Sequence, residues 1–235
     1  MQLTILGNNG PYPAAGGACS GYLLRSEQAT VLIECGTGVL ANLRAVCSPD
    51  RLDAVILSHL HYDHMSDMLP MQYALQFCPP RERLPVYAPA APEAVRNLLD
   101  APTFELKEIC DMQIGDIRFS FMPVRHPVPS YALRAECGGR ILVYTGDTNA
   151  VDGLAAFCSG ADLLLADAGL SAADWRMESP HLSAAGCGQL AAEAGVQRLL
   201  LSHLNPKYAP EQLCAEAREA FDRVDCAYIG KSCVI

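Results

Sequence analysis

The sequence predicts a layered α/β fold in which helices cover the outside of a mixed β-sheet system. Short apolar runs rich in Val, Ile and Leu recur along the whole chain and are typical of buried strands. Helical stretches alternate with these runs, most regularly in the second half, and this alternation is typical of layered α/β proteins. Several of the apolar runs end in an acidic side chain or a histidine, which predicts a site where strand ends meet.

The apolar runs predict ten strands and the stretches between them predict four helices. The strands are expected at Leu3–Leu6, Gly21–Arg25, Ala29–Glu34, Ala54–Ser58, Pro85–Ala88, Asp116–Pro123, Tyr131–Glu136, Arg140–Thr145, Leu163–Ala166 and Leu199–Ser202. The helices are expected at Met68–Phe77, Ala91–Leu99, Ser183–Ala194 and Pro210–Asp222. Pro92 suits the first turn of the second helix, and Ser183 and Gly195 suit the two ends of the third.

Composition indicates one folded domain over residues 1–235. Hydrophobic residues make up 51% of the chain and charged residues 18%, which excludes a disordered protein. The net charge of −9 argues against a broad surface for nucleic acid, which is normally basic.

Eleven cysteines without a C-x-x-C pair indicate single buried thiols in a reducing cytoplasm, not a zinc knuckle. A disulfide-stapled secreted protein is the alternative, but the N-terminal residues lack the pattern of a signal peptide. No apolar run approaches the roughly 20 residues that a membrane span needs, so we expect no membrane contact.

The run His59-Leu60-His61-Tyr62-Asp63-His64 is the strongest chemical signal in the chain. It contains half of the six histidines, and imidazole with carboxylate is a common ligand set for zinc-like ions. A chance surface cluster is the alternative. The run follows a predicted strand, and Asp147, Asp167 and His203 each follow another. Because strand ends in α/β proteins meet at one edge, we expect these side chains to converge on a metal site.

These motifs, in this order, resemble the metallo-β-lactamase superfamily over almost the whole chain. The matching segments are His59–His64, then His126, then Tyr144-Thr145-Gly146-Asp147-Thr148, then Leu201-Ser202-His203-Leu204. The resemblance implies a four-layer αββα sandwich with the site at one edge of two packed sheets. Within the superfamily, the chain resembles the RNase Z-like, phosphodiesterase-like subgroup.

The resemblance implies two divalent metal ions, with Zn²⁺ as the first choice and Mn²⁺ or Fe²⁺ as alternatives for this nitrogen and oxygen ligand set. His59, His61 and His126 would hold the first ion, and Asp63, His64 and His203 the second. Asp147 would bridge both. A metal-bridged hydroxide would then be the attacking group, as two-metal hydrolases use it.

The resemblance also implies three catalytic candidates, Asp63, His181 and Asp167. In the subgroup, an acid at the place of Asp167 pairs with a histidine at the place of His181, which lets the imidazole give a proton to a leaving oxygen. A histidine at the entry of a helix is the alternative for His181. The loop Leu6-Gly7-Asn8-Asn9-Gly10-Pro11 would line the cleft, with an ordinary turn as the alternative.

Two positions depart from the family pattern. Glu34, in Glu34-Cys35-Gly36-Thr37-Gly38, stands where the family usually has an aspartate that supports the site. Asp167 stands where the subgroup more often has glutamate. Either departure could change how the neighbouring ligands are held.

The spacing of the motifs predicts a small substrate. RNase Z carries a long tRNA-gripping arm between the ligands that match His126 and Asp147, but only 21 positions (147 − 126) separate them here. We therefore expect no tRNA partner, and a hydrolase acting on a small or cyclic phosphodiester. The alternatives are a thioester or lactam hydrolase and a non-catalytic metal or ligand sensor. The resemblance leaves a homodimer open.

Overall fold

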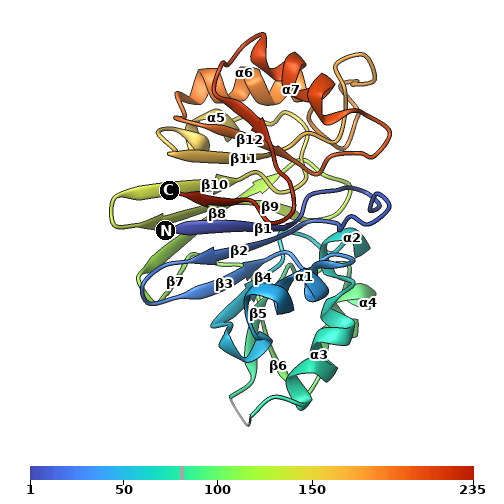
Figure 1. The fold of residues 1–235 in the computed structure, drawn as a ribbon, viewed down its shortest axis with the longest axis vertical. Helices are drawn as coiled ribbons and strands as arrows, with labels where there is room; N and C mark the ends of the chain where they lie inside the picture. The colour runs from blue at the N-terminus through green and yellow to red at the C-terminus, as the bar shows by residue number, and fades with distance from the viewer. Residues whose placement is uncertain (80–81) are drawn as a thin grey trace.

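The computed structural model describes residues 1–79 and 82–235 and contains two packed seven-stranded sheets (Figure 1). The first sheet has the order β14-β1-β2-β3-β4-β5-β6. Its strands are β1 (Gln2–Gly7), β2 (Gly21–Arg25), β3 (Thr30–Ile33), β4 (Ala54–Ile56), β5 (Leu84–Tyr87), β6 (Phe104–Lys107) and β14 (Ser232–Val234).

The second sheet has the order β13-β12-β11-β10-β9-β8-β7. Its strands are β7 (Met112–Ile114), β8 (Ile117–Val124), β9 (Ser130–Cys137), β10 (Arg140–Tyr144), β11 (Leu163–Asp167), β12 (Leu199–Ser202) and β13 (Val224–Cys226). The α-helices are α1 (Val39–Val46), α2 (Tyr62–Met65), α3 (Met68–Gln76), α4 (Glu93–Arg96), α5 (Leu154–Cys158), α6 (Ala184–Ala194) and α7 (Pro210–Arg218).

Each sheet joins an antiparallel half to a parallel half. In the first sheet β3 to β6 run parallel, and in the second β10 to β13 do. Parallel strands bring their carboxyl ends to the same edge of a sheet. The residues that follow β10, β11 and β12 therefore emerge side by side.

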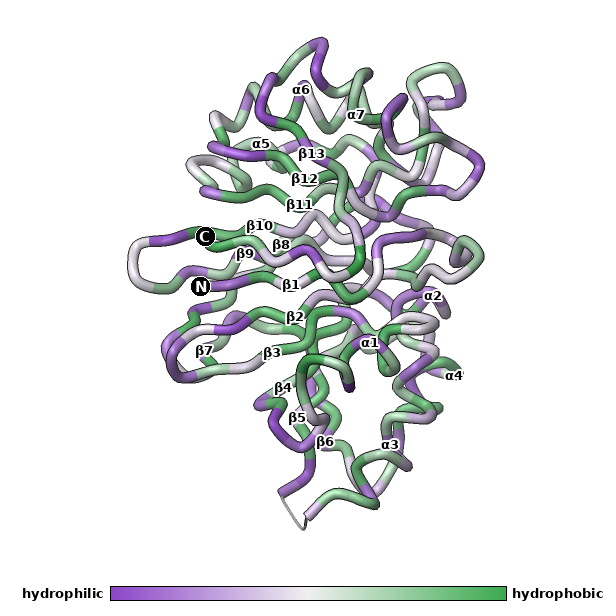
Figure 2. The backbone as a smooth tube through the Cα atoms, viewed as in Figure 1, coloured by the Kyte–Doolittle hydropathy of each residue, from purple (hydrophilic) through white to green (hydrophobic). Residues whose placement is uncertain are grey.

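Three apolar clusters separate four layers, which confirms the predicted αββα sandwich. One cluster lies between the two sheets and includes Leu3 and Leu142. The others pack the first sheet against α1 and α3, and the second sheet against α5, α6 and α7. The strand regions of Figure 2 are largely hydrophobic, as this burial requires. Within the described residues, no helix has the length and apolar character to cross a membrane.

All ten predicted strands form, with ends within two residues of those expected. Four strands were missed: β6, β7, β13 and β14. They are three or four residues long, so none contains an apolar run or an alternation of apolar and polar residues long enough to predict a strand. Helices α1, α2 and α5 were missed as well, and they too are short.

Two predicted helices are wrong in extent. The stretch Ala91–Leu99 contains the short α4 and then a separate 3-10 turn, and Pro92 lies before the helix in extended backbone. Helix α4 buries none of its residues, so packing does not extend it. Helix α7 ends at Arg218, not Asp222, because the chain turns there to enter β13. The cap at Ser183 is confirmed, since its hydroxyl accepts a hydrogen bond from the Gly186 N–H.

Candidate metal centre

The predicted site residues come together where the strands of both sheets end. His59 lies just beyond β4, and His203 directly follows β12. Asp147 lies just beyond β10, while Asp167 is itself the last residue of β11. Because these strands emerge at neighbouring edges, residues up to 144 positions apart (203 − 59) meet in one cluster.

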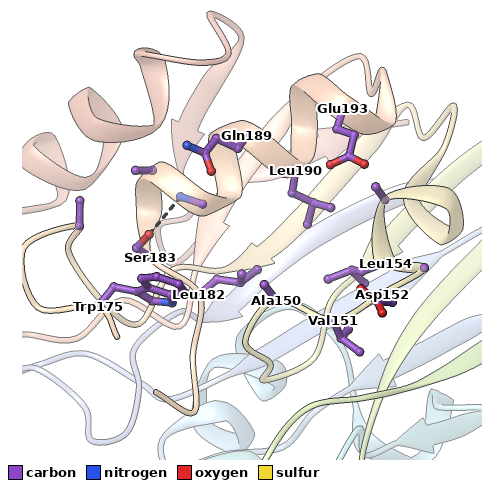
Figure 3. A pocket seen from close by; sticks show the side chains of 15 residues that line it. Ala150, Val151, Asp152, Leu154, Trp175, Leu182, Ser183, Gln189, Leu190 and Glu193 are labelled. Carbon is purple, nitrogen blue, oxygen red and sulfur yellow. Dashed lines mark hydrogen bonds between the residues drawn. The ribbon is translucent and has the colours of Figure 1, made fainter. Parts of the chain in front are cut away.

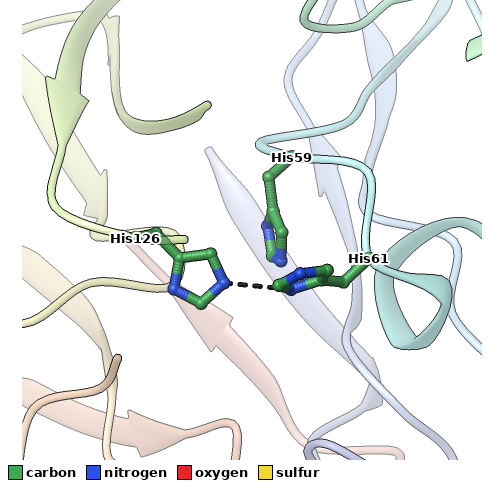
Figure 4. A group of neighbouring side chains, drawn as sticks. All are labelled: His59, His61 and His126. Carbon is green, nitrogen blue, oxygen red and sulfur yellow. Dashed lines mark hydrogen bonds between the residues drawn. The ribbon is translucent and has the colours of Figure 1, made fainter. Parts of the chain in front are cut away.

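One histidine group consists of His59, His61 and His126, whose rings face one another in Figure 4. One nitrogen of each lies within 4.8 Å of the others. His126 Nε2 is 3.0 Å from His61 Nδ1, so two ring nitrogens already point at a shared space. This geometry suits three imidazoles that hold one cation.

The histidines of this group favour the neutral form. Burial lowers the pKa of His59 well below its usual value, and it also lowers the pKa of His61 and His126. His126 Nδ1 lies 3.1 Å from the Pro180 carbonyl and donates to it, which leaves Nε2 with its lone pair. His59 Nδ1 lies 3.0 Å from the Ser58 hydroxyl, so its Nε2 is the nitrogen left for a ligand.

Asp147 occupies the centre of the whole cluster. It is 1% exposed, and its Oδ2 lies 3.2 Å from His203 Nε2, 3.3 Å from His64 Nε2 and 3.6 Å from His59 Nε2. Burial alone would raise its pKa, but His203, His64 and His59 together hold it well below the usual range. Asp147 is therefore an anion in contact with both histidine groups, which is the position that a bridging carboxylate needs.

The second group consists of Asp63, His64 and His203 around the same Asp147 oxygen. Asp63 Oδ2 lies 3.1 Å from His203 Nε2 and 3.5 Å from His64 Nε2. Burial would lower the pKa of both histidines, but Asp147 and the other carboxylates raise it, for His203 to about 10. Without a cation these rings carry protons, and a divalent ion placed among the carboxylates would replace them.

A buried carboxylate stands behind each histidine of the second group. Glu34 is fully buried, accepts from the Ser58 N–H at 3.1 and 3.2 Å, and lies 3.6 Å from His64 Nδ1. Asp167 Oδ1 lies 3.4 Å from His203 Nδ1. Such carboxylates fix the ring so that Nε2 faces a metal. The supporting place of Glu34 was predicted, whereas the contact of Asp167 with His203 was not.

The predicted Asp167–His181 pair is present in the structure. His181 Nδ1 lies 2.9 Å from Asp167 Oδ2, and the His181 ring stacks on that of His203 with centroids 4.8 Å apart. Burial would lower the pKa of His181, but Asp167 and then Asp147 raise it. With Nδ1 bound to Asp167, Nε2 is the nitrogen left to act on another molecule.

The backbone is strained at two residues of the site. Glu34 and His203 adopt positive φ angles of 60° and 53°, which residues other than glycine rarely do.

The predicted cleft loop packs directly on the cluster. A Cβ at Gly10 would lie 1.9 Å from His203 Nε2, so only glycine fits there. The Gly10 N–H bonds to the Leu204 carbonyl, which ties the loop to the segment carrying His203.

Asn149 is a supporting residue that the sequence analysis missed. It is 1% exposed, and its amide nitrogen lies 2.7 Å from the Ser179 carbonyl and 3.1 Å from that of Met177. Its Oδ1 accepts from the Trp175 indole. Asn149 thereby holds the segment that leads to the Pro180 carbonyl and to His181. Its place two residues after Asp147 is the one signal in the sequence that points to it.

The cluster fits a bound cation. On the metal-facing side, His59 Nε2, His64 Nε2 and Asp147 Oδ1 are buried and lack hydrogen-bond partners within the described residues. Buried polar atoms without partners are costly unless they bind something. The donors are imidazole nitrogens and carboxylate oxygens, which suit divalent transition metals.

A cavity of about 530 Å³ lies between α6 and the segment Ala150–Ala155 (Figure 3). Trp175, Leu182 and Leu190 contribute apolar surface, while Asp152 and Glu193 contribute carboxylates. None of the predicted metal ligands lines it, and no lysine or arginine does. The charged side chains of its lining are therefore acidic, which disfavours a phosphate group.

Comparisons with known proteins agree with this geometry. A model of the β-lactamase superfamily domain matches residues 29–204. The probable metallo-hydrolase YhfI of Bacillus subtilis is 34% identical over 231 residues, which cover 94% of this chain and 94% of that protein. The crystal structure of YhfI aligns with a TM-score of 0.94 at 33% identity, covering 99% of each chain.

A relative in the predicted subgroup is ribonuclease Z of Mycolicibacterium gilvum. It is 29% identical over 250 residues, which cover 90% of this chain and 87% of that protein. Together with the superfamily match, this likeness confirms the predicted resemblance to the RNase Z-like subgroup.

Proposed function

This chain belongs to the metallo-β-lactamase superfamily, and on that premise we propose that it is a binuclear metal-dependent hydrolase of small or cyclic phosphodiesters. Residues 1–235 would act as one hydrolase domain. The observation that carries the phosphodiester assignment is the Asp167–His181 pair, with Nδ1 to Oδ2 at 2.9 Å, placed beside Asp147. A cytoplasmic location is part of the proposal, and eleven free thiols support it.

The metal-holding roles follow the two groups of side chains. His59, His61 and His126 would hold one divalent ion, and Asp63, His64 and His203 the other. Asp147 would contact both, because its carboxylate lies between the two groups. Zn²⁺ is the first choice for these ligands. When bound, the ions would supply a water of lowered pKa and positive charge opposite the phosphoryl oxygens.

The residues around the metals would move and hold protons. Asp167 accepts from His181 Nδ1 and raises the pKa of that imidazole, which favours the protonated form that can give its Nε2 proton to the leaving oxygen. The hydrogen bond from His203 and the nearby His64 ring hold the pKa of Asp63 down against the effect of burial, so Asp63 stays an anion beside the reacting centre. Its carboxylate orients the proton of an attacking water.

A proton donor at this position favours phosphodiesters over thioesters and lactams. An alkoxide leaving from phosphorus is a strong base and gains much from a proton, whereas a thiolate gains little. The stacked His181 and His203 rings keep the donor close to the metal-holding residues.

A small substrate fits this chain better than tRNA. The segment between His126 and Asp147 contains β9, β10 and the tight Gly138-Gly139 turn. It therefore has no room for a tRNA-gripping arm, and the net charge of −9 opposes binding of a polyanion. Three relatives are named ribonuclease Z, so tRNA processing is the alternative that the assays below must distinguish.

Parallel assays on the metal-loaded protein would test the proposal. Metal content is measured first, and we expect close to two ions per chain. Turnover is then compared on bis-p-nitrophenyl phosphate, a cyclic nucleotide, a thioester, a chromogenic β-lactam and a tRNA precursor. We expect the phosphodiesters to have the highest kcat/KM. A higher kcat/KM on the thioester, the lactam or the tRNA precursor would contradict the substrate assignment, and two bound ions without turnover of any ester would indicate a sensor.

A further inference from the structure

Two cysteines behave differently from the other nine. Cys214 and Cys226 have sulfur atoms 2.7 Å apart, whereas no other pair of cysteine sulfurs is hydrogen-bonded within residues 1–79 and 82–235. The separation lies between that of unbonded sulfurs and the ~2.05 Å of a disulfide bond. The two thiols therefore already occupy neighbouring positions that a covalent link requires.

The pair joins two elements of the outer part of the fold. Cys214 is buried on α7, while Cys226 is half-buried at the end of β13, where solvent reaches the pair. Cys226 Sγ also lies 3.2 Å from the Pro210 carbonyl oxygen at the start of α7. Both sulfurs are thus held against the same helix, so oxidation needs little movement of the backbone.

We propose that Cys214 and Cys226 form a thiol-oxidation site that closes reversibly into an intramolecular disulfide between α7 and β13. This inference is independent of the substrate of the metal centre. The oxidant is a small disulfide such as oxidised glutathione, and the reaction is thiol–disulfide exchange.

The exchange balances in two steps. A thiolate of the pair attacks one sulfur of oxidised glutathione, the glutathione S–S bond breaks, and one glutathione leaves as its thiolate. The second cysteine loses its proton and displaces the other glutathione from the mixed disulfide. The protein loses two electrons and two protons, and two reduced glutathiones take them up. The hydrogen bond from Cys226 lowers the pKa of the Cys214 thiol against the effect of burial, which favours the thiolate.

The link would lie next to the strand that carries a predicted metal ligand. Cys226 pairs with Leu201 on β12, two residues before His203. The disulfide closes a short loop of 12 positions (226 − 214), and such a loop loses freedom in the unfolded chain. We therefore expect the oxidised protein to have a higher Tm and to keep its metal content.

The test uses the full-length, metal-loaded protein incubated with oxidised glutathione, with free thiols then blocked by iodoacetamide. Intact mass should show two fewer blocked thiols, and peptide mapping should find residues 214 and 226 in one linked peptide. The Tm should rise by roughly 5 °C or more. Dithiothreitol should reverse both changes.

Matched variants keep the result interpretable. Cys110→Ser removes an exposed thiol and should still form the linked peptide. Cys214→Ser and Cys226→Ser should each lose it, and the cysteine that remains of the pair should be found as a blocked thiol or as a mixed disulfide with glutathione. If either fails to fold, peptide mapping of the wild-type protein still decides the question. Recovery of both residues as blocked free thiols after oxidation, or linkage of either to another cysteine, would overturn the proposal.

Discussion

The two histidine groups of the proposed metal centre, here called its two halves, differ in the direction of their pKa shifts. Burial dominates around His59, His61 and His126, and it lowers the pKa of all three. Carboxylates dominate around His64 and His203, and they raise the pKa of both. One half presents neutral imidazoles to a cation, and the other presents a cluster of negative charge that protons share when no cation is present.

Histidines can thus be suited to a metal ion in two ways: burial can keep the ring neutral, or nearby carboxylates can supply negative charge that attracts a cation. Among the described residues, Asp147 is the carboxylate that lies within ion-pair distance of the first half, through His59. The second half has Asp63 in contact and Glu34 and Asp167 behind the rings. Asp147 contacts both halves, so substituting it should weaken metal binding in both. Substituting Glu34 should weaken metal binding in the second half alone.

The largest expected effect is that of Asp147→Ala. Removing the shared carboxylate takes away a contact to His59, His64 and His203 at once. Supporting residues alone cost 10–100-fold, so loss of a shared ligand should lower kcat/KM by more than about a hundredfold. Elemental analysis should show loss of metal in parallel. A folded Asp147→Ala protein with wild-type activity would refute the assignment of both halves.

The next effect separates proton donation from metal binding. His181→Ala should keep both ions, because His181 stands outside the two ligand groups. It should lower kcat by about 10²–10⁴-fold on a substrate with an alkoxide leaving group. On bis-p-nitrophenyl phosphate, whose leaving group needs no proton, kcat should change little. An equal loss on both substrates would show that His181 only supports the structure.

The histidines of the site could be predicted from the sequence because their pattern is local and ordered. Three of them fall within His59–His64, His126 and His203 follow predicted strands, and His181 precedes a predicted helix. The order of the strands within each sheet could not be predicted. Asp167 faces His203 because β11 and β12 run parallel with Asp167 opposite Ser202, and that register is a property of the assembled sheet.

Other supporting residues were missed for a similar reason. Asn149 carries no chemical signature, and its role depends on where the segment around Trp175 folds back. The edge strands β7 and β13 are three residues long, and pairing with a longer neighbour stabilises them more than their own pattern does. Residues whose role comes from long-range contacts are thus the ones that sequence patterns leave out.

A smaller effect is expected from Glu34→Gln, which should weaken one half of the site. The variant keeps the size of the side chain but removes the charge that lies 3.6 Å from His64 Nδ1. Loss of such a supporting carboxylate should weaken binding of the second ion about 10–100-fold and leave the first unchanged. Competition with a chromogenic chelator measures both affinities. Glu219→Gln, an exposed site with the same charge change, is the control and should match the wild type.

The two proposed ions should also differ in how their affinity depends on pH. In the metal-free protein His64 and His203 have raised pKa values, about 10 for His203, so an ion entering their half must displace protons. Raising the pH from 6.5 to 8.5 should therefore tighten the second ion by about tenfold per unit for each proton released. The first ion meets rings that are already neutral, and its affinity should stay nearly constant.

The thermal stability of the metal-free protein tests the same proton exchange independently. Whereas metal affinity should rise with pH, this stability should fall. The raised pKa of His203 means that its protonated contacts with Asp147 and Asp63 stabilise the fold fully below the unfolded value of about 6.5. This stabilisation is lost as the pH rises through about 10. The Tm of the metal-free protein should therefore fall over this window, while the metal-loaded protein, which has exchanged the protons for ions, should lack that fall. The same Tm slope in both forms would show that the ions do not replace these protons.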